Sequence, residues 1–148
     1  MKIVLLSHSL RKGGAERILL EIANGLINLG HIVNVITWID EDAFISEYNS
    51  INRVSLLKKN HYSGLKSIPK SIFPLRRALK SFNPDIIHIH SPNIATLFSF
   101  TFINTPVIHV IHGYGKIAQD NNLLKKKEFS SVLLGEKDGS YFFISFWQ

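Results

Sequence analysis

The sequence predicts an α/β fold, a doubly wound parallel β-sheet with helices on both faces, in one domain of 148 residues. Apolar runs such as "IVLL", "DIIHI" and "PVIHVI" are nearly continuous, which is typical of strands buried on both faces. Longer segments with apolar residues at helical spacing separate these runs. The alternation predicts six strands, at residues 2–7, 32–37, 53–57, 85–90, 106–111 and 141–145.

Four helices are predicted to connect these strands. In the first, apolar residues recur every three or four positions over residues 15–26, and Gly30 stands where a helix commonly ends in the left-handed conformation. A second helix is expected to begin near Pro74, a third near Pro92, and a fourth is expected across residues 121–134.

The composition excludes several kinds of site. The chain contains no cysteine, which removes disulfides, thiolate metal sites and thiol nucleophiles and favours a reducing cytoplasm. The first apolar run, residues 3–6, is shorter than the apolar core of a secretory signal. The longest other apolar stretch, residues 94–103, falls well short of the roughly 20 residues that a membrane-spanning helix needs. We therefore expect a cytoplasmic location and no transmembrane segment.

The net charge of +6 is unevenly distributed, because residues 48–84 contain no Asp or Glu. One interpretation is a peripheral membrane contact through the basic stretch 53–80, and the other is a solvated helix face. Pro69 and Pro74 are expected to prevent one long amphipathic helix in this stretch. Its eight basic residues are Arg53, Lys58, Lys59, Lys66, Lys70, Arg76, Arg77 and Lys80.

A ligand site is expected beyond the carboxyl ends of the strands, where the strand order of a doubly wound sheet reverses. Gly13 and Gly14 follow the first strand and precede the first helix, whose free N–H groups and dipole favour an anion such as a phosphate. Arg17 lies one turn further along. The other polar residues that directly follow predicted strands are Ser7 and His8 after the first, His90 and Ser91 after the fourth, and His112 after the fifth.

Other binding chemistries are less favoured. The segment around Gly13 is not a GxGxxG fingerprint, and no acidic residue closes the second predicted strand before Asp40, which disfavours a nicotinamide-binding domain. No G-x-S-x-G elbow or hydrolase triad spacing occurs. The pI is about 9.7, yet the basic residues lack the interleaved aromatics of a stacking platform, so no nucleic acid partner is expected.

His88 and His90 lie two residues apart on a predicted strand, so their side chains face the same way. Together with His112 they form one candidate metal site. The alternative, which we favour for His88 and His109, is a hydrogen-bonded or partly exposed polar residue at a strand end, whereas the position of His90 and His112 at the ligand-bearing edge argues for function. No metal and no other cofactor is predicted.

Three segments of the chain are similar to a known family: "KIVLLSHSLRKGGAERILLEIANGLINLGHIVNVIT" at 2–37, "PDIIHIHSPN" at 84–93 and "PVIHVIHGYG" at 106–115. They resemble the family 4-like retaining glycosyltransferases, whose GT-B architecture joins two Rossmann-like domains. The resemblance implies that residues 1–148 form the N-terminal, acceptor-side Rossmann-like half, incomplete at its C-terminus. The C-terminal half, which carries the family's E-x7-E motif and binds the donor, is then absent, and the chain alone is expected to be inactive.

The resemblance also implies roles for individual residues. Gly13, Gly14 and Arg17 match positions that lie against the donor phosphates. His112 matches the strand-end histidine beside the reacting sugar, and is the implied catalytic residue through positioning and polarising hydroxyls. His90 and Ser91 match an acceptor-side wall.

The resemblance implies a nucleotide-sugar donor and a glycan or lipid-linked acceptor, as in surface polysaccharide synthesis, with the enzyme at the inner face of the cell membrane. Two alternatives stay open. The chain could be an acceptor- or membrane-binding subunit completed in trans by a second Rossmann-like chain, or a gene remnant without function.

Overall fold

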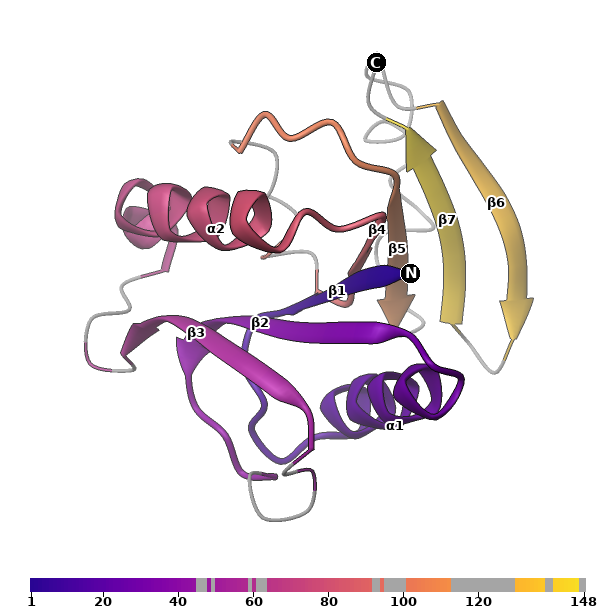
Figure 1. The fold of residues 1–148 in the computed structure, drawn as a ribbon, viewed down its shortest axis with the longest axis horizontal. Coiled ribbons are helices and arrows are strands. Elements are labelled where there is room, and N and C mark those ends of the chain that lie inside the picture. The colour runs from indigo at the N-terminus through magenta and orange to yellow at the C-terminus, as the bar shows by residue number, and fades with distance from the viewer. Residues whose placement is uncertain are drawn as a thin grey trace.

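Seven strands and two α-helices follow one another in the part of the chain that the structure describes (Figure 1). The computed structural model describes residues 1–44, 48, 50–58, 60, 64–91, 94, 101–112, 130–137 and 140–146. The elements are β1 (Lys2–Ser7), α1 (Gly14–Asn28), β2 (Ile32–Asp40), β3 (Asn52–Lys58), the 3-10 turn η2 (Gly64–Ser67), α2 (Ile68–Phe82), β4 (Ile86–Ile89), β5 (Val107–His112), β6 (Ser130–Lys137) and β7 (Ser140–Phe146).

All of these strands belong to one sheet, in the order β3-β2-β1-β4-β5-β7-β6. The five strands from β3 to β5 run parallel, so that Leu5 of β1 lies opposite Val35 of β2 on one side and His88 of β4 on the other. A five-stranded parallel sheet with helices is a Rossmann-like α/β fold, which confirms the predicted fold class. β7 pairs antiparallel with both β5 and β6, so this edge departs from the all-parallel sheet that the sequence predicted.

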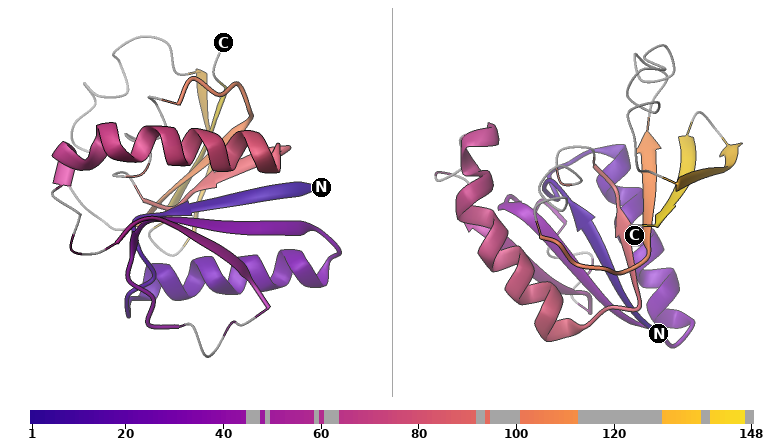
Figure 2. Two further views of the ribbon diagram at one scale, coloured as in Figure 1. Left: turned by 60° about the vertical axis from the view of Figure 1, so that its left-hand side comes forward. Right: turned by 90° about the horizontal axis from the view of Figure 1, so that it is seen from above.

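The two helices cover opposite faces of the sheet (Figures 1 and 2). Side chains of β1 alternate between the two faces: Leu5 belongs to one buried cluster with Leu19 of α1, and Leu6 belongs to the other with Leu75 of α2. Each of these leucines is fully buried, which contributes on the order of 2 kcal/mol per side chain from removal of apolar surface from water. The near-continuous apolar runs of the sequence reflect these two cores.

Helix α1 ends as the sequence predicted. Gly30 has a φ of +82°, in the left-handed region that residues with a Cβ disfavour. The N–H of Gly30 donates to the carbonyl of Ile27 over 2.9 Å, and the N–H of His31 donates to the carbonyl of Leu26 over 3.0 Å. These two bonds form a Schellman motif, which satisfies the last carbonyls of the helix and turns the chain into β2.

Helix α2 begins at Ile68, and the prediction that it begins near Pro74 was wrong. Pro69 lies in the first turn, where a missing N–H removes no intrahelical bond. Pro74 lies inside the helix and is exposed, so the Lys70 carbonyl that loses its helical partner is on the solvent side. The two prolines therefore do not break this helix, contrary to expectation.

Residues 130–134 were predicted to be the end of a helix, and this was wrong, because they lie in β6. β6 pairs antiparallel with β7, from Ser130 opposite Phe146 to Lys137 opposite Ser140. The sequence has "DG" at 138–139, and such a pair between two strand-like runs is a hairpin signal that helical spacing alone overlooks. Residues 121–129 and most of the helix predicted near Pro92 lie outside the described residues.

Candidate functional site

The sheet reverses its strand order between β1 and β4. From β1, the chain crosses through α1 on one face to reach β2, and from β3 it crosses through α2 on the other face to reach β4. β1 therefore lies between β2 and β4, and the carboxyl ends of β1 and β4 flank the switch point. In folds of this class, this is where a crevice for ligands opens.

The segments that follow three strands meet at this edge. The N–H of His90, just after β4, donates to the carbonyl of Leu6 in β1 over 2.8 Å. The N–H of Ile39 in β2 donates to the carbonyl of His8 over 3.0 Å. The backbone of His112 ends β5 at the same edge, opposite Ser140 of β7, whereas residues 113–115 lie outside the described part of the chain.

His90 lies on the α1 face of the sheet. His88 is paired with Leu5, whose side chain belongs to the cluster beneath α1, and the rings of His88 and His90 contact each other edge to face with centroids 5.5 Å apart. Both histidines are buried, and Ser91 is half-buried. The side chain of His90 therefore lies on the face that carries α1, at the same edge as the N-terminus of that helix.

His8 lies on the opposite face, toward α2. Its ring contacts the ring of Trp38 edge to face, with centroids 5.7 Å apart, and Trp38 belongs to the α2-side cluster. Burial lowers the pKa of His8 below 6.5, and the positive charge of Arg11 lowers it further, while Glu41 and Glu16 act in the opposite direction. His8 is therefore a neutral imidazole at pH 7, able to donate one hydrogen bond and accept another.

The N-terminus of α1 has an exposed glycine pair. Gly13 is the N-cap with φ −166° and ψ 157°, an extended conformation that any residue can adopt. A Cβ built on Gly13 would collide with the carboxylate of Glu16, which folds back over the N-terminal turn. A carboxylate in this position is stabilised by the free N–H groups and the helix dipole.

Gly14 and Arg17 differ from Gly13 in their surroundings. A Cβ on Gly14 would meet no other atom within 4 Å, so neither space nor backbone conformation requires glycine there. Arg17 is exposed in the first turn, and its N–H donates to the Gly13 carbonyl over 3.2 Å. The fold itself therefore gives no reason for glycine at position 14, which leaves room for a ligand to approach the backbone.

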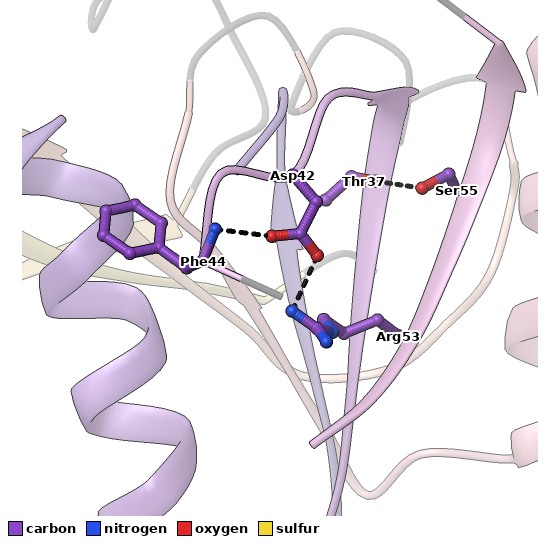
Figure 3. A network of polar contacts seen from close by, with 5 residues as sticks. All are labelled: Thr37, Asp42, Phe44, Arg53 and Ser55. Atoms are coloured by element: carbon purple, nitrogen blue, oxygen red, sulfur yellow. Dashed lines mark hydrogen bonds and ion pairs between the residues drawn. The ribbon is translucent and has the colours of Figure 1, made fainter. Parts of the chain in front are cut away.

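A polar network fixes the segment after β2 beside this loop. The N–H of Leu10 donates to the carbonyl of Glu41 over 2.8 Å, which ties the β1–α1 loop to the end of β2. Asp42 Oδ2 forms an ion pair with Arg53 Nη1 at 2.6 Å, and Asp42 Oδ1 accepts a hydrogen bond from the N–H of Phe44 at 2.9 Å (Figure 3). The β1–α1 loop is thus bound to the segment after β2, and that segment is in turn bound to β3 through Asp42 and Arg53.

The structure removes one of the two grounds against a nicotinamide-binding domain. β2 extends to Asp40, three positions beyond its predicted end at 37, so an acidic residue does close the second strand. The other ground remains, since Gly13 and Gly14 are followed by Ala15, Glu16 and Arg17 rather than by the spacing of the dinucleotide fingerprint.

Two kinds of feature are absent from the described residues, a cluster of metal ligands and a membrane-spanning helix. No three His, Cys, Asp or Glu side chains among them lie close enough together to hold a metal ion, and the absence of a cofactor stays a prediction. No helix among them is long and apolar enough to cross a membrane.

Sequence reasoning identified the edge and placed His8 at it, but it missed Glu16 and the buried environment of His8. Glu16 stands at the third helical position, where a capping carboxylate is expected, and this signal was available in "GGAE". The lowered pKa of His8 depends on burial against Trp38, which is thirty positions away in sequence and gives no local signal.

Comparison with known proteins places the chain among related sequences. A model of glycosyltransferase family 4 matches residues 12–134. The GalNAc-alpha-(1->4)-GalNAc-alpha-(1->3)-diNAcBac-PP-undecaprenol alpha-1,4-N-acetyl-D-galactosaminyltransferase of Campylobacter jejuni subsp. jejuni serotype O:2 is 32% identical over 113 residues, which are 73% of this chain and 31% of that protein. The chain thus spans about a third of the length of this relative.

Among solved structures, the chain is similar to glycinamide ribonucleotide transformylase 1 from Symbiobacterium toebii, with a TM-score of 0.49 and 14% sequence identity. The superposition covers 91% of this chain and 66% of that one.

Proposed function

The chain belongs to glycosyltransferase family 4, and from this premise we propose that it is the acceptor-side domain of an enzyme that transfers a sugar from a nucleotide-sugar to a glycan or lipid-linked acceptor. The observation that carries the proposal is the switch point, where the N-terminus of α1 and the polar residues after β1 and β4 share one edge of the sheet. The relative from Campylobacter is named for an undecaprenol-linked substrate, which favours a lipid-linked acceptor here.

The proposed donor site is the N-terminus of α1. The donor phosphates lie against Gly13 and Gly14, where a side chain would separate them from the N–H groups, and Arg17 adds a positive charge from an exposed position. Glu16 now occupies part of this N-terminus, so its carboxylate moves aside when phosphate binds, because two anions repel each other there.

The proposed acceptor wall is formed by His90 and Ser91, which follow β4 on the other side of the switch point. His112, at the end of β5, positions and polarises the hydroxyls of the reacting sugars. His8 is an additional candidate, because its neutral ring can accept a hydrogen bond from an acceptor hydroxyl.

Catalysis in this proposal is electrostatic. The bond between the sugar and the nucleotide phosphate breaks, the acceptor oxygen forms the new bond to the sugar, and the acceptor proton passes to the departing phosphate. The helix N-terminus and Arg17 stabilise the negative charge that develops on the departing phosphate. Configuration at the sugar is retained, and no metal ion takes part. An α product, as in the name of the relative, is what retention gives from an α-linked nucleotide-sugar.

The proposal assigns the remaining donor contacts to a second Rossmann-like domain. The support is that the relative is about three times as long as the segment it shares with this chain. The second domain either belongs to the same polypeptide or is supplied in trans by another chain. The site of action is the cytoplasmic face of the cell membrane, in surface polysaccharide synthesis, and residues 1–148 alone are not expected to transfer sugar.

The test is a titration of the 148-residue chain followed by backbone amide chemical shifts. A short-chain polyprenyl-diphosphate-linked aminosugar is expected to shift the amides of His90 and Ser91, and a uridine nucleotide-sugar those of Gly13 and Gly14. Ser91→Tyr should weaken acceptor binding about tenfold or more by filling the wall, and Ser50→Tyr, on an exposed position before β3, should not. Shifts confined to the amino edge of the sheet, or none with either ligand, would overturn the proposal.

A further inference from the structure

The outer face of α2 carries an unusual combination of positive charge and one exposed aromatic ring. Phe73 is 78% exposed, although phenylalanine is normally buried. At about 100° per residue, the basic residues of this helix and of the turn before it all fall within about 60° of Phe73. We refer to these six residues as the α2 strip: Lys66, Lys70, Phe73, Arg76, Arg77 and Lys80.

The opposite face of α2 is occupied by the core, so the strip has no role in packing the helix. Ser67, Ser71, Leu75 and Leu79 repeat every four residues and are buried at 1% exposure or less. In Figures 1 and 2, α2 forms the outer layer on its side of the sheet. The strip thus points away from the core, and replacement of its residues is not expected to disturb the fold.

The charge of the strip is not balanced locally. No Asp or Glu occurs from residue 48 to residue 84. Within the described residues, one ion pair is found, between Arg53 of β3 and Asp42 in the segment after β2. Arg53 therefore does not belong to the basic surface, and the stretch 53–80 singled out by the sequence narrows to residues 66–80.

The shape of the strip favours a flat anionic surface. The strip runs for about 20 Å along a convex helix face, since each helical residue rises about 1.5 Å. Phe73, Arg76, Arg77, Lys80 and Ser81 line a shallow open depression, so an apolar ring and three basic side chains share one part of the surface. Single-stranded nucleic acid is usually held in a groove by several stacking aromatic rings, and this strip has one such ring and no groove.

We propose that the α2 strip docks the chain on a membrane that contains anionic lipids, with Phe73 inserted among the headgroups and the basic side chains on their phosphates. Basic residues near an anionic bilayer each strengthen binding, and an inserted apolar ring adds to them. In this proposal α2 provides the contact area by lying along the membrane surface, and it does not cross the bilayer.

The docked orientation also has a consequence for the candidate site, and this step rests on the proposed function. α2 runs antiparallel to the strands, because its C-terminal end leads to Asp85, whose N–H donates to the Lys2 carbonyl at the amino edge over 2.8 Å. The end of the strip with Lys66 and Lys70 therefore lies toward the carboxyl edge. A lipid-linked acceptor in the same bilayer would approach the switch point from this side.

The experiment is co-sedimentation of the 148-residue chain with vesicles of phosphatidylglycerol and phosphatidylcholine, or of phosphatidylcholine alone. The chain is expected to bind the anionic vesicles and to be released in about 0.5 M salt, where charges are screened within a few ångströms. Arg76→Gln/Arg77→Gln/Lys80→Gln should weaken binding about 100-fold, at about fivefold for each charge. Phe73→Ser should weaken it about tenfold at unchanged charge.

A matched control removes the same charge from exposed positions outside the α2 strip. Lys2→Gln/Arg11→Gln/Lys12→Gln alters three exposed residues, none of them on α2, and should bind vesicles nearly as well as the unmodified chain. Equal loss in the two triple variants, or equal binding to neutral and anionic vesicles, would overturn the proposal. So would strip-dependent binding to RNA without binding to vesicles. No sugar is present in this assay, so its result is independent of whether the chain supports sugar transfer.

Discussion

The indole Nε1 of Trp38 donates a hydrogen bond to the hydroxyl oxygen of Ser71 over 2.8 Å, and this bond joins β2 to α2 inside the core. Ser71 in turn donates from its hydroxyl to the carbonyl oxygen of Ser67 over 2.8 Å. Trp38 and Ser71 are both 0% exposed. The contact places α2 on its face of the sheet and, through the ring of Trp38, supports His8 at the carboxyl edge.

Ser71→Ala is expected to lower the free energy of unfolding by about 1–3 kcal/mol, because the buried indole N–H loses this acceptor. Urea unfolding followed by tryptophan fluorescence measures the change. Ser81→Ala, at an exposed position on the same helix, is the control and should change stability by less than about 0.5 kcal/mol. Equal effects of the two substitutions would mean that the Trp38–Ser71 bond contributes nothing to stability.

The Asp42–Arg53 ion pair is expected to stabilise the loop between β2 and β3. Its two side chains are 18% and 15% exposed, so the pair is partly shielded from water and from salt. Arg53→Gln should lower the free energy of unfolding by about 1 kcal/mol, and less in 1 M salt. Unfolding in urea at low and high salt measures both effects, and a loss that does not depend on salt would argue against a Coulombic contribution.

The sequence predicted the parts of the fold that depend on local patterns. The first five strands, α1 and the left-handed Gly30 follow from apolar runs, helical spacing and the conformational freedom of glycine. Pro74 misled the prediction of α2, because a proline is tolerated inside a helix when the carbonyl it frees faces water. β6 was missed because its short apolar run fits a helix as well as a strand, and what favours the strand is the "DG" hairpin signal in the sequence and the pairing with β7 in the structure.

The location of the candidate site was predictable from the sequence, but the contacts of its side chains were not. Parallel strands and a switch point bring the segments after β1 and β4 to one edge, and the sequence shows where those strands end. The sequence does not show which side chains at this edge are buried against aromatic rings and which basic residues are paired with a carboxylate. The environment of His8 depends on Trp38, and the exclusion of Arg53 from the basic surface depends on Asp42, and both contacts form only in the folded sheet.

Stability is expected to fall as the pH falls from 7 to 5. Burial, and then the charge of Arg11, lowers the pKa of His8, and burial lowers the pKa of His109. The unfolded chain, in which these groups have a pKa of about 6.5, therefore binds protons at a higher pH than the folded chain. The contribution of neutral His8 and His109 to the free energy of unfolding is fully present above pH 6.5. It is lost as the pH falls through 6.5 toward the lower pKa of the folded state.

The check is urea unfolding at pH 8, 7, 6 and 5 of the unmodified chain and of His8→Gln/His109→Leu. The double variant should lose less stability between pH 7 and pH 5, because two groups that bind protons on unfolding have been removed. Between pH 7 and pH 8 the two proteins should keep a constant difference in stability. Parallel curves over the whole range would show that neither histidine is responsible for the pH dependence.

Substitutions at the glycines that flank α1 are expected to distinguish a role in the fold, at Gly30, from a role in ligand binding, at Gly13 and Gly14. Gly30→Ala should lower the free energy of unfolding by about 1–2 kcal/mol, because a Cβ is strained at a φ of +82°. Gly13→Ala and Gly14→Ala should change it by less than about 0.5 kcal/mol, since Gly13 is extended and would displace only the end of the Glu16 side chain, and Gly14 has open space.

In the proposed transferase, Gly13→Ala and Gly14→Ala should lower sugar transfer by about tenfold or more if donor phosphates contact the N-terminus of α1, since an added methyl group holds them away from the N–H groups. Gly30→Ala, measured at a temperature where the protein is fully folded, should leave transfer unchanged, because Gly30 lies at the far end of the helix. Full activity in Gly14→Ala would mean that the phosphates are bound elsewhere, whatever the fold around α1.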